Sequence, residues 1–382
     1  MSKFAELGKD SAPPNGEDVL GVIYKRISEI PAKPIKWLWP GKFAKGKISI
    51  IAGNPGVGKS QVCASMASIV SNGGQWPVDR SATECGSVII LSAEDDVEDT
   101  IRPRLEAAGA DIDKIYILQA IRYETESGTE ESRGFNLLKD AYRLGDLMMK
   151  IGDVALVIID PITAYMGAVD SHRNAEVRSM LAPLQVIAAA SNAAIIAVSH
   201  LTKAQGVEAL QRIQGSIAFS AAARAVWGVV KDKDNPHRRL FLQLKNNLST
   251  DDTGLAYALE SFVLEGSEPP IGTSHVVWED AKITMSADEA FSSIAKDFTE
   301  HSEIEDAKDF LRSLLVSGPM KALDIERDAK GAGHSWSTVR RAQRDMKIES
   351  YKDNFKGPWF WRLPGLGYED DHAAQHDERL RG

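Results

Sequence analysis

A glycine-rich segment, GNPGVGKS at residues 53–60, constrains the fold more than any other feature of the sequence. It matches the pattern Gly-x-x-x-x-Gly-Lys-Ser/Thr, follows an apolar run (Lys47–Ala52) and precedes a segment of helical pattern, QVCASMASIV. Glycines let a backbone wrap closely around phosphate with its N–H groups pointing inward, and a helix N-terminus adds a positive dipole end. The segment therefore predicts a strand–loop–helix unit that binds a nucleoside triphosphate, and a chance glycine-rich turn is the less favoured alternative.

The chemistry of this loop predicts ATP as the substrate and Mg²⁺ as the cofactor. We expect Lys59 to reach the β- and γ-phosphates and the hydroxyl of Ser60 to bind Mg²⁺. The loop residues expected to surround the nucleotide are Gly53, Asn54, Pro55, Gly56, Val57, Gly58, Lys59, Ser60 and Gln61.

Short apolar runs separated by helical patterns predict an α/β fold with a mostly parallel central sheet. The clearest runs are Lys47–Ala52, Ser87–Ser92, Ala155–Asp160, Ala194–Ser199, Ala225–Val230 and Arg239–Lys245. The last two are close together in the chain, so we interpret them as an antiparallel pair at the edge of the sheet.

Two carboxylates at strand ends are candidates for the catalytic centre. Asp160 closes the run LVIID, where it can bind Mg²⁺ through water beside the phosphate loop. The next residue is Pro161 rather than a glutamate, so the group that activates the attacking water must lie elsewhere. We favour Glu94, in LSAEDD, as that base; the alternative is that Glu94 is an acid at a helix N-terminus, as Asp95 and Asp96 would be.

Bulk composition narrows the class of protein further. The 382 residues carry a net charge of −9, which argues against a protein that is basic throughout but permits a local basic stripe. Cys63 and Cys85 belong to no metal-binding pattern, and such low cysteine use predicts a cytoplasmic protein. The N-terminus lacks the apolar region of a signal peptide, and Leu181–Val198 reads as a helix followed by a strand, so no membrane partner is expected.

Changes in composition divide the chain into segments. We expect a loosely ordered lead-in at residues 1–34, an ATPase core at 35–285 and a polar linker at 286–302. A small compact unit at 303–364 and a charged, disordered tail at 365–382 follow.

Six segments in a fixed order resemble one family of proteins. They are GNPGVGKS, LSAEDD with the following RPRLEAAGA, LVIIDP, VSHLTK, GSIAFSAAARAVW and LKNN. Between Trp37 and Leu259 the chain resembles the RepA-type hexameric replicative helicases of plasmids and their phage relatives, which are RecA/DnaB-like ATPases. The resemblance implies a homo-oligomer, with six subunits in a ring, that acts on single-stranded DNA.

The same resemblance implies roles for residues outside the phosphate loop. Glu94 would be the catalytic base, Arg104 would lie near the adenine, and His200 would sense the γ-phosphate. Arg224 would act as an arginine finger across a subunit boundary, with Lys245 assisting it. The loop from Thr202 to Gln214 would face the channel of the ring, with Lys203 and Arg212 available to DNA phosphates.

Each implied role has a structural alternative. His200 lies at the end of a strand, where open α/β sheets bind ligands, but it can also be a satisfied structural histidine. We place Arg224 in an alanine-rich helix, where it can also be a salt-bridged surface residue. Asn246 and Asn247 follow Lys245, where the family usually shows a glycine or a basic residue, and the channel loop can be an ordinary surface loop.

The C-terminal unit has the pattern of a winged helix-turn-helix domain. Helical patterns at 305–316, 322–329 and 337–348 precede two alternating segments, YKDNFKG and PWFWRL, that predict a wing. A basic third helix would lie on DNA, through Arg340, Arg341, Arg344 and Lys347. Lys352 and Lys356 could contact the backbone from the wing. Trp336, Trp359, Phe360 and Trp361 are read mainly as core residues, with base stacking as the alternative, and such domains also dock proteins, including replication proteins.

These patterns leave three functions open. The favoured one is an ATP-driven motor on DNA, akin to the replicative helicase of a mobile element. The others are an ATP-dependent DNA-binding switch or loader that does not unwind, and a RecA-like recombination factor.

Overall fold

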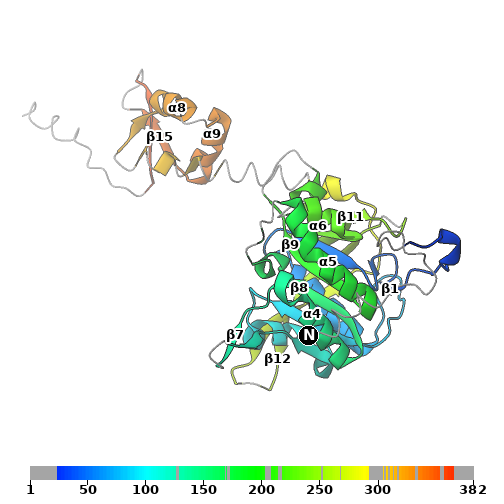
Figure 1. Cartoon of the computed structure of the whole chain (residues 1–382). Coiled ribbons are helices and arrows are strands. Elements are labelled where there is room, and N and C mark those ends of the chain that lie inside the picture. Colours follow the sequence, from blue (N-terminus) through cyan, green and yellow to red (C-terminus); the bar gives the residue numbers. More distant parts are fainter. Residues whose placement is uncertain are drawn as a thin grey trace, which may run out of the picture. The chain divides into compact units, whose positions relative to one another are not determined.

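The apolar runs of the sequence form the strands of one large sheet in the first of two units, Met1–Ser292 and Ser293–Gly382 (Figure 1). The computed structural model describes residues 24–125, 129–167, 169, 173–202, 208–213, 217–250, 253–266, 268–291, 304, 307–308, 310–312, 314–315, 318–331, 334–352 and 357–364.

Within the described residues, the central sheet has nine strands in the order β13-β12-β11-β10-β3-β9-β8-β4-β5. Their bounds are β3 (Ile48–Gly53), β4 (Ser87–Ser92), β5 (Ile115–Ile117), β8 (Val154–Asp160), β9 (Ala194–His200), β10 (Ala225–Lys231), β11 (Arg238–Asn246), β12 (Leu255–Leu264) and β13 (Ile271–Trp278). The strands from β10 to β5 are parallel to their neighbours, and β11, β12 and β13 are antiparallel additions. The predicted α/β fold with a mostly parallel sheet is confirmed.

The pairing of the last two predicted strands is confirmed, but their position was wrong. β10 and β11 are antiparallel, yet they do not form the edge of the sheet, because the hairpin of β12 and β13 continues it beyond β11. This hairpin was missed in the sequence because its outer half carries exposed residues on both faces.

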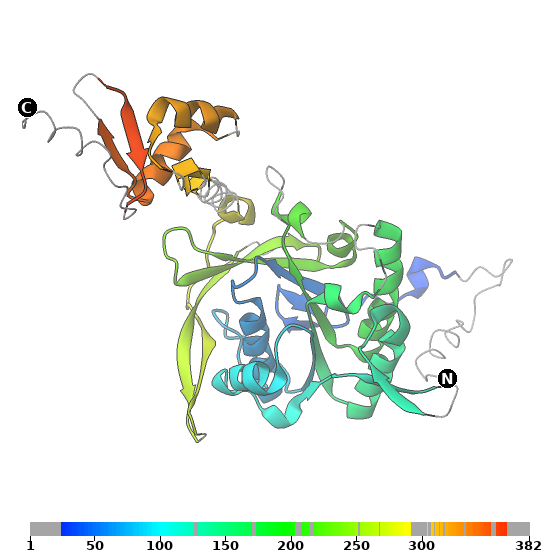
Figure 2. The ribbon, with the colours of Figure 1, turned by 90° about the vertical axis from the view of Figure 1, so that its left-hand side faces the viewer.

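Helices cover both faces of the sheet (Figure 2). They are α2 (Lys59–Asn72), α3 (Arg102–Ala107), α4 (Leu137–Ile151), α5 (Asn174–Ser191) and α6 (Ile217–Ala222). α2 and α3 lie on one face, α4 and α5 on the other, and the β12–β13 hairpin curves over α2 (Figure 2). No described helix has the length and apolarity that a membrane crossing requires.

Smaller elements complete the first unit. Among its described residues, two hairpins lie outside the large sheet: β1 (Trp37–Trp39) with β2 (Phe43–Ala44), and β6 (Ile121–Glu124) with β7 (Glu130–Arg133). The short helical turns are η1 (Ile27–Glu29), η2 (Val97–Ile101), η3 (Ile112–Lys114), η4 (Ile162–Tyr165) and η5 (Ala209–Arg212). Residues 287–291, in the segment expected to be a linker, are helical, and the ring of Phe291 packs over Gly228 of β10.

An aromatic cluster fills the core on the α2 side of the sheet. Trp39 stacks on Trp76 with ring centroids 4.5 Å apart and meets Trp278 edge-on at 5.8 Å. Trp278 in turn lies 5.1 Å from Tyr257 of β12. Aromatic rings bury large areas and fix one another's orientation. This cluster therefore holds the β12–β13 hairpin against β1 and the segment after α2.

The second unit contains a three-stranded sheet in the order β14-β16-β15. Described residues between 304 and 315 are helical. The described elements that follow are β14 (Met320–Lys321), α8 (Ala322–Gly331), α9 (Trp336–Asp345), β15 (Glu349–Lys352) and β16 (Trp359–Arg362). Ser335 caps α9 by accepting a hydrogen bond from the N–H of Thr338, and β15 pairs antiparallel with β16. Trp361 is buried and stacks on Trp336, whereas Trp359 is exposed, so one of these aromatic residues lies outside the core.

Candidate active site

The phosphate loop connects β3 to α2 and is built around two glycines in the left-handed region. Gly56 has a φ of 71° and Gly58, the N-cap of α2, a φ of 97°, values that side chains other than glycine rarely adopt. At Gly53 a Cβ would lie 2.5 Å from the carbonyl oxygen of Val229, so β10 also requires a glycine there. The predicted strand–loop–helix unit is therefore present, with the N-terminus of α2 facing the loop.

Lys59 folds back over the loop. Its Nζ donates hydrogen bonds to the carbonyl oxygens of Gly53 and Asn54, both at 3.0 Å. Burial lowers the pKa of Lys59, and the nearby carboxylates of Asp160 and Glu94 oppose that shift. The ammonium group thus lies in the mouth of the loop, where a phosphate would replace the two carbonyl groups as its partner.

Ser60 and Asp160 form the pair expected to hold the metal ion. The hydroxyl of Ser60 donates to Oδ2 of Asp160 at 2.6 Å, and burial raises the pKa of Asp160. Among the described residues no group of three or more His, Cys, Asp or Glu could hold a metal ion by itself. One hydroxyl and one carboxylate beside a phosphate loop fit Mg²⁺, which usually takes its remaining ligands from substrate phosphates and water.

His200 links Lys59 to Glu94. Its Nδ1 lies 3.3 Å from Nζ of Lys59 and its Nε2 lies 3.4 Å from Oε1 of Glu94. An ammonium group only donates and a carboxylate only accepts, so this geometry assigns the proton of the neutral ring to Nε2. The structure therefore brings Lys59, Ser60, Glu94, Asp160 and His200 together at the carboxyl edge of the parallel strands.

The two acidic residues after Glu94 have separate partners. Asp96 caps η2 by accepting hydrogen bonds from the N–H groups of Glu98 and Asp99. Asp95 forms an ion pair with Arg104 of α3. The capping role that was the alternative for Glu94 is thus filled by Asp96, and the side chain of Glu94 is 59% exposed beside His200.

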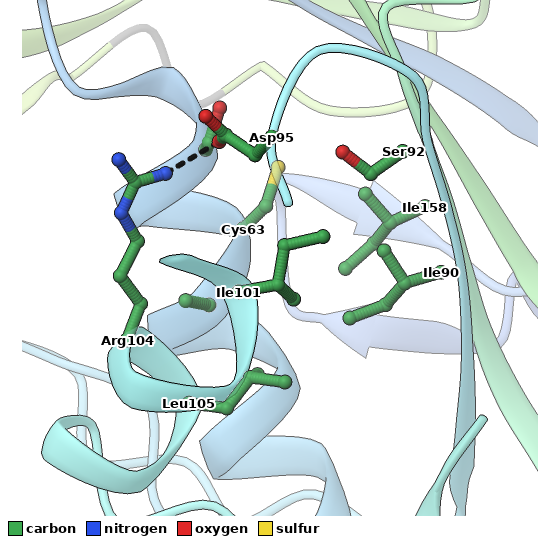
Figure 3. Close-up of a pocket in the computed structure, with 10 residues that line it drawn as sticks. Cys63, Ile90, Ser92, Asp95, Ile101, Arg104, Leu105 and Ile158 are labelled. Atoms are coloured by element: carbon green, nitrogen blue, oxygen red, sulfur yellow. Dashed lines mark hydrogen bonds and ion pairs between the residues drawn. The ribbon is translucent and has the colours of Figure 1, made fainter. Parts of the chain in front are cut away.

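Arg104 borders a small cavity next to the phosphate loop, as Figure 3 shows. The cavity has a volume of about 30 Å³ and also contacts Ser60, Cys63, Ile101 and Leu105. Burial raises the pKa of Cys63 well above its usual range. The recess beside the phosphate site is therefore lined largely by apolar side chains, with the Arg104–Asp95 ion pair at its rim.

Gln61 points away from the loop, toward the β12–β13 hairpin. Its Nε2 donates to Oγ of Ser274 in β13 at 2.9 Å. The hydroxyl of Tyr257 in β12 donates to the carbonyl oxygen of Val57 at 3.2 Å. Sequence reasoning missed Tyr257 because the contact joins residues 200 positions apart and no local pattern indicates it.

Arg224 and Lys245 lie at the amino end of the parallel strands, opposite the phosphate loop. The prediction that Arg224 belongs to a helix was wrong, because α6 ends at Ala222 and Arg224 directly precedes β10. The N–H of Arg224 donates to the carbonyl oxygen of Ile48, at the start of β3, whereas the phosphate loop follows the end of that strand. Five residue steps at roughly 3.3 Å each separate the two ends by about 16 Å, so Arg224 is remote from the phosphate loop of its own chain.

Lys245 lies next to Arg224. Its Nζ donates to the carbonyl oxygens of Ser220 and Ala223, at 2.6 and 3.0 Å. Burial, and to a smaller extent Arg224, lowers the pKa of Lys245. Arg224 also lines a cavity of about 130 Å³ between the start of β3 and α5.

The expected channel loop is described only in part. Lys203 lies outside the described residues, as does Lys356 of the expected wing. Arg212, at the end of η5, is only 8% exposed, and burial lowers its pKa. Arg212 therefore does not project into solvent, as a direct contact with DNA phosphates would require.

The basic residues expected to contact DNA from the third helix of the C-terminal unit are exposed. Arg340, Arg341, Arg344 and Lys347 lie on or just after α9, on the side away from its buried residues Val339 and Ala342. Lys352 lies over the exposed ring of Trp359, 5.1 Å from its centroid.

A parallel sheet with a phosphate loop after one strand, a histidine at the end of the next strand and carboxylates at the ends of the two strands beyond it defines a class. This class is the P-loop nucleoside triphosphatases of RecA-like fold. Residues 18–206 match the family model described as "AAA domain". The first unit is therefore a RecA-like P-loop ATPase domain.

Comparison with curated proteins finds similarity to DNA repair proteins RadA from three Streptococcus pyogenes strains, of serotypes M6, M18 and M1. Each is 27% identical to this chain over 208 residues, which are 53% of this chain. The match spans only 38% of the length of those proteins.

Proposed function

We propose that this protein is an ATP-driven motor on DNA that hydrolyses ATP at the boundary between two copies of the chain, as a replicative helicase of a plasmid or phage would. The observation that carries the proposal is the separation of two half-sites. Lys59, Glu94 and Asp160 meet at the carboxyl end of the parallel strands, while Arg224 lies at their amino end. A finger residue at that position can serve only the nucleotide of a neighbouring copy, and a hexameric ring repeats such a boundary six times.

Each residue then has one task in the reaction. Lys59 leaves the carbonyl groups of Gly53 and Asn54 to contact the β- and γ-phosphates. Ser60 and Asp160 would hold Mg²⁺, which would neutralise phosphate charge. Glu94 orients the attacking water and accepts its proton, held in place by Nε2–H of His200. Arg224 from the neighbouring copy stabilises the charge that develops on the transferred phosphoryl group.

The C-terminal unit would act on DNA as a winged helix. Its order of elements, with a capped basic helix followed by an antiparallel strand pair, supports that reading of residues 303–364. We place single-stranded DNA in the ring and leave replication proteins as further partners of the C-terminal unit. The DNA repair function named for the RadA relatives favours a RecA-like recombination or repair factor as the second candidate.

The decisive experiment measures ATP turnover with and without single-stranded DNA, together with the mass of the assembly. We expect an oligomer, stimulation by DNA, and loss of turnover in Arg224→Ala with ATP binding retained. A monomer whose Arg224→Ala variant hydrolyses normally would remove the shared-site mechanism, and filaments in place of closed rings would favour recombination.

Mixing two inactive variants tests the shared site directly. Lys59→Ala lacks the nucleotide half and Arg224→Ala lacks the finger half, so an intact site forms where a Lys59→Ala copy offers its arginine to an Arg224→Ala copy. We expect the mixture to recover a measurable part of wild-type turnover, whereas either variant alone stays inactive. No recovery after subunit exchange would place Arg224 outside the site.

A further inference from the structure

We infer that Tyr257 is a positioning residue for the phosphate loop: its hydroxyl sets the orientation of the Val57–Gly58 peptide so that an N–H group faces the phosphates. The inference rests on the proposed binding of ATP at this loop. It concerns a contact between β12 and the loop that no motif in the sequence indicates.

The two polar groups of the Val57–Gly58 peptide lie on opposite sides of the loop. In a trans peptide the C=O and the following N–H point in opposite directions. The carbonyl oxygen of Val57 accepts the hydrogen bond from the hydroxyl of Tyr257 at 3.2 Å, on the side of β12. The N–H of Gly58 must therefore point to the other side, into the turn of the loop.

The next peptide is fixed in the same manner by the helix. The carbonyl oxygen of Gly58 accepts the first helical hydrogen bond of α2, from the N–H of Val62 at 3.0 Å. The N–H of Lys59 therefore points back toward the loop, as do the free N–H groups of any helix N-terminus. Two consecutive N–H groups thus converge on the place where a phosphate oxygen would lie. Tyr257 sets the first, and α2 sets the second together with the same hydroxyl, which also donates to the carbonyl oxygen of Gly58 at 3.5 Å.

Burial and packing make the Tyr257 contact rigid. Tyr257 is 0% exposed, and burial raises the pKa of its phenol, which favours the protonated hydroxyl that donates this hydrogen bond. Leu259 of the same strand lies against Gly58, with Cδ1 3.2 Å from the position a Cβ would occupy there. Val57 itself is buried, whereas residues Asn54–Gly56 are partly or fully exposed. The contacts with β12 therefore hold the second half of the loop.

The test uses the full chain with the single change Tyr257→Phe, which keeps the ring and removes the hydroxyl. We expect the dissociation constants for ATP and for inorganic tripolyphosphate, measured by calorimetry, to rise about three- to tenfold, the usual effect of one neutral hydrogen bond. We expect KM for ATP to rise by the same factor and kcat to stay within about twofold, because the loop binds ground state and transition state alike.

Trp278→Phe is the matched control. Trp278 packs on Tyr257, but its Nε1 donates to the hydroxyl of Ser65 inside α2 rather than to the loop. This variant should lower the thermal midpoint of the nucleotide-free protein and leave both dissociation constants at the wild-type value. Equal weakening in both variants would mean general loosening of the core and would overturn the inference.

Leu259→Ala provides a second route if Tyr257→Phe does not fold, because it frees Gly58 without a polar change, and it should also weaken ATP binding. If the wild type binds ATP tightly and both the Tyr257→Phe and Leu259→Ala variants bind it equally well, only the role of Tyr257 is removed. Absence of ATP binding by the wild type itself would remove the proposed function together with this inference.

Discussion

Three consecutive acidic residues after β4 have three different partners. Glu94 faces His200, Asp95 pairs with Arg104, and Asp96 caps η2. A cap or an ion pair stabilises a local structure, whereas a half-exposed carboxylate beside the phosphate loop is free to meet a substrate. Of the three, Glu94 is therefore the candidate for the base.

Glu94→Gln should lower the rate of ATP hydrolysis by roughly 100-fold or more, because the amide keeps the shape but cannot accept a proton. ATP binding should be unchanged, as measured by calorimetry. Asp96→Asn is the matched control, since asparagine also caps a helix, and should hydrolyse ATP normally. A Glu94→Gln variant with wild-type turnover would assign the base elsewhere.

Asp160→Asn should raise the stability of the nucleotide-free protein at neutral pH while abolishing Mg²⁺-dependent turnover. Because burial raises the pKa of Asp160 in the folded state, its ionised form destabilises the fold, and this cost appears as pH rises through the unfolded and then the folded pKa. The asparagine variant should therefore melt higher than the wild type near pH 7. The gap should close as the pH falls below about 4, where the carboxyl of the wild type is protonated. A gap that persists unchanged in acid would contradict this origin.

At the scale of elements, a short helix is fastened to the strand that follows Arg224. Phe291, in helical residues 287–291, packs over Gly228, where a Cβ would lie 2.7 Å from the ring. Nearby, Oδ1 of Asp288 accepts a hydrogen bond from the N–H of Ala209 in η5. The helical residues 287–291, at the C-terminal end of the first unit, therefore contact both β10 and η5.

Gly228→Ala should destabilise the first unit by about 1–3 kcal/mol, because the added methyl group forces the aromatic ring aside. Phe291→Ala removes the ring and should also destabilise, by about 3 kcal/mol or more. The double variant should lose less than the sum, since the two side chains contact each other. Strict additivity in denaturant unfolding would contradict the close contact.

The sequence predicted those elements whose signals are local. Each of the six apolar runs became a strand, and the glycine pattern located the turn between β3 and α2. It did not predict the β12–β13 hairpin, whose outer half carries exposed residues on both faces. It also missed the contact of Tyr257 with Val57, because that contact joins residues 200 positions apart in the chain. Arg224 was misplaced because alanine favours helices, whereas pairing with β3 overrides that propensity from Ala225 onward.

For the whole molecule, the charge of the C-terminal unit predicts how binding to DNA responds to salt. Arg340 and Arg344 are one helical turn apart on the exposed side of α9. Replacing both by alanine should weaken binding to DNA and reduce the slope of log K against log salt by about two, one for each lost phosphate contact. ATP turnover without DNA should not change.

Arg327→Ala is the matched control for this charge removal. Arg327 lies in α8 of the same unit and is already paired with Asp324 and Asp328. Its loss should leave the salt slope unaltered. An unaltered slope in the α9 double variant would instead favour docking to a protein partner.

The distance between Arg224 and the phosphate loop gives each molecule two unlike ends. Copies that associate through these two different surfaces assemble head to tail, and only a closed ring gives every copy the same two interfaces. An open row of n copies would carry one working junction fewer than its number of members, and a lone copy would carry none. The rate per molecule should therefore fall on dilution below the assembly threshold, and it should be independent of concentration once all rows have closed.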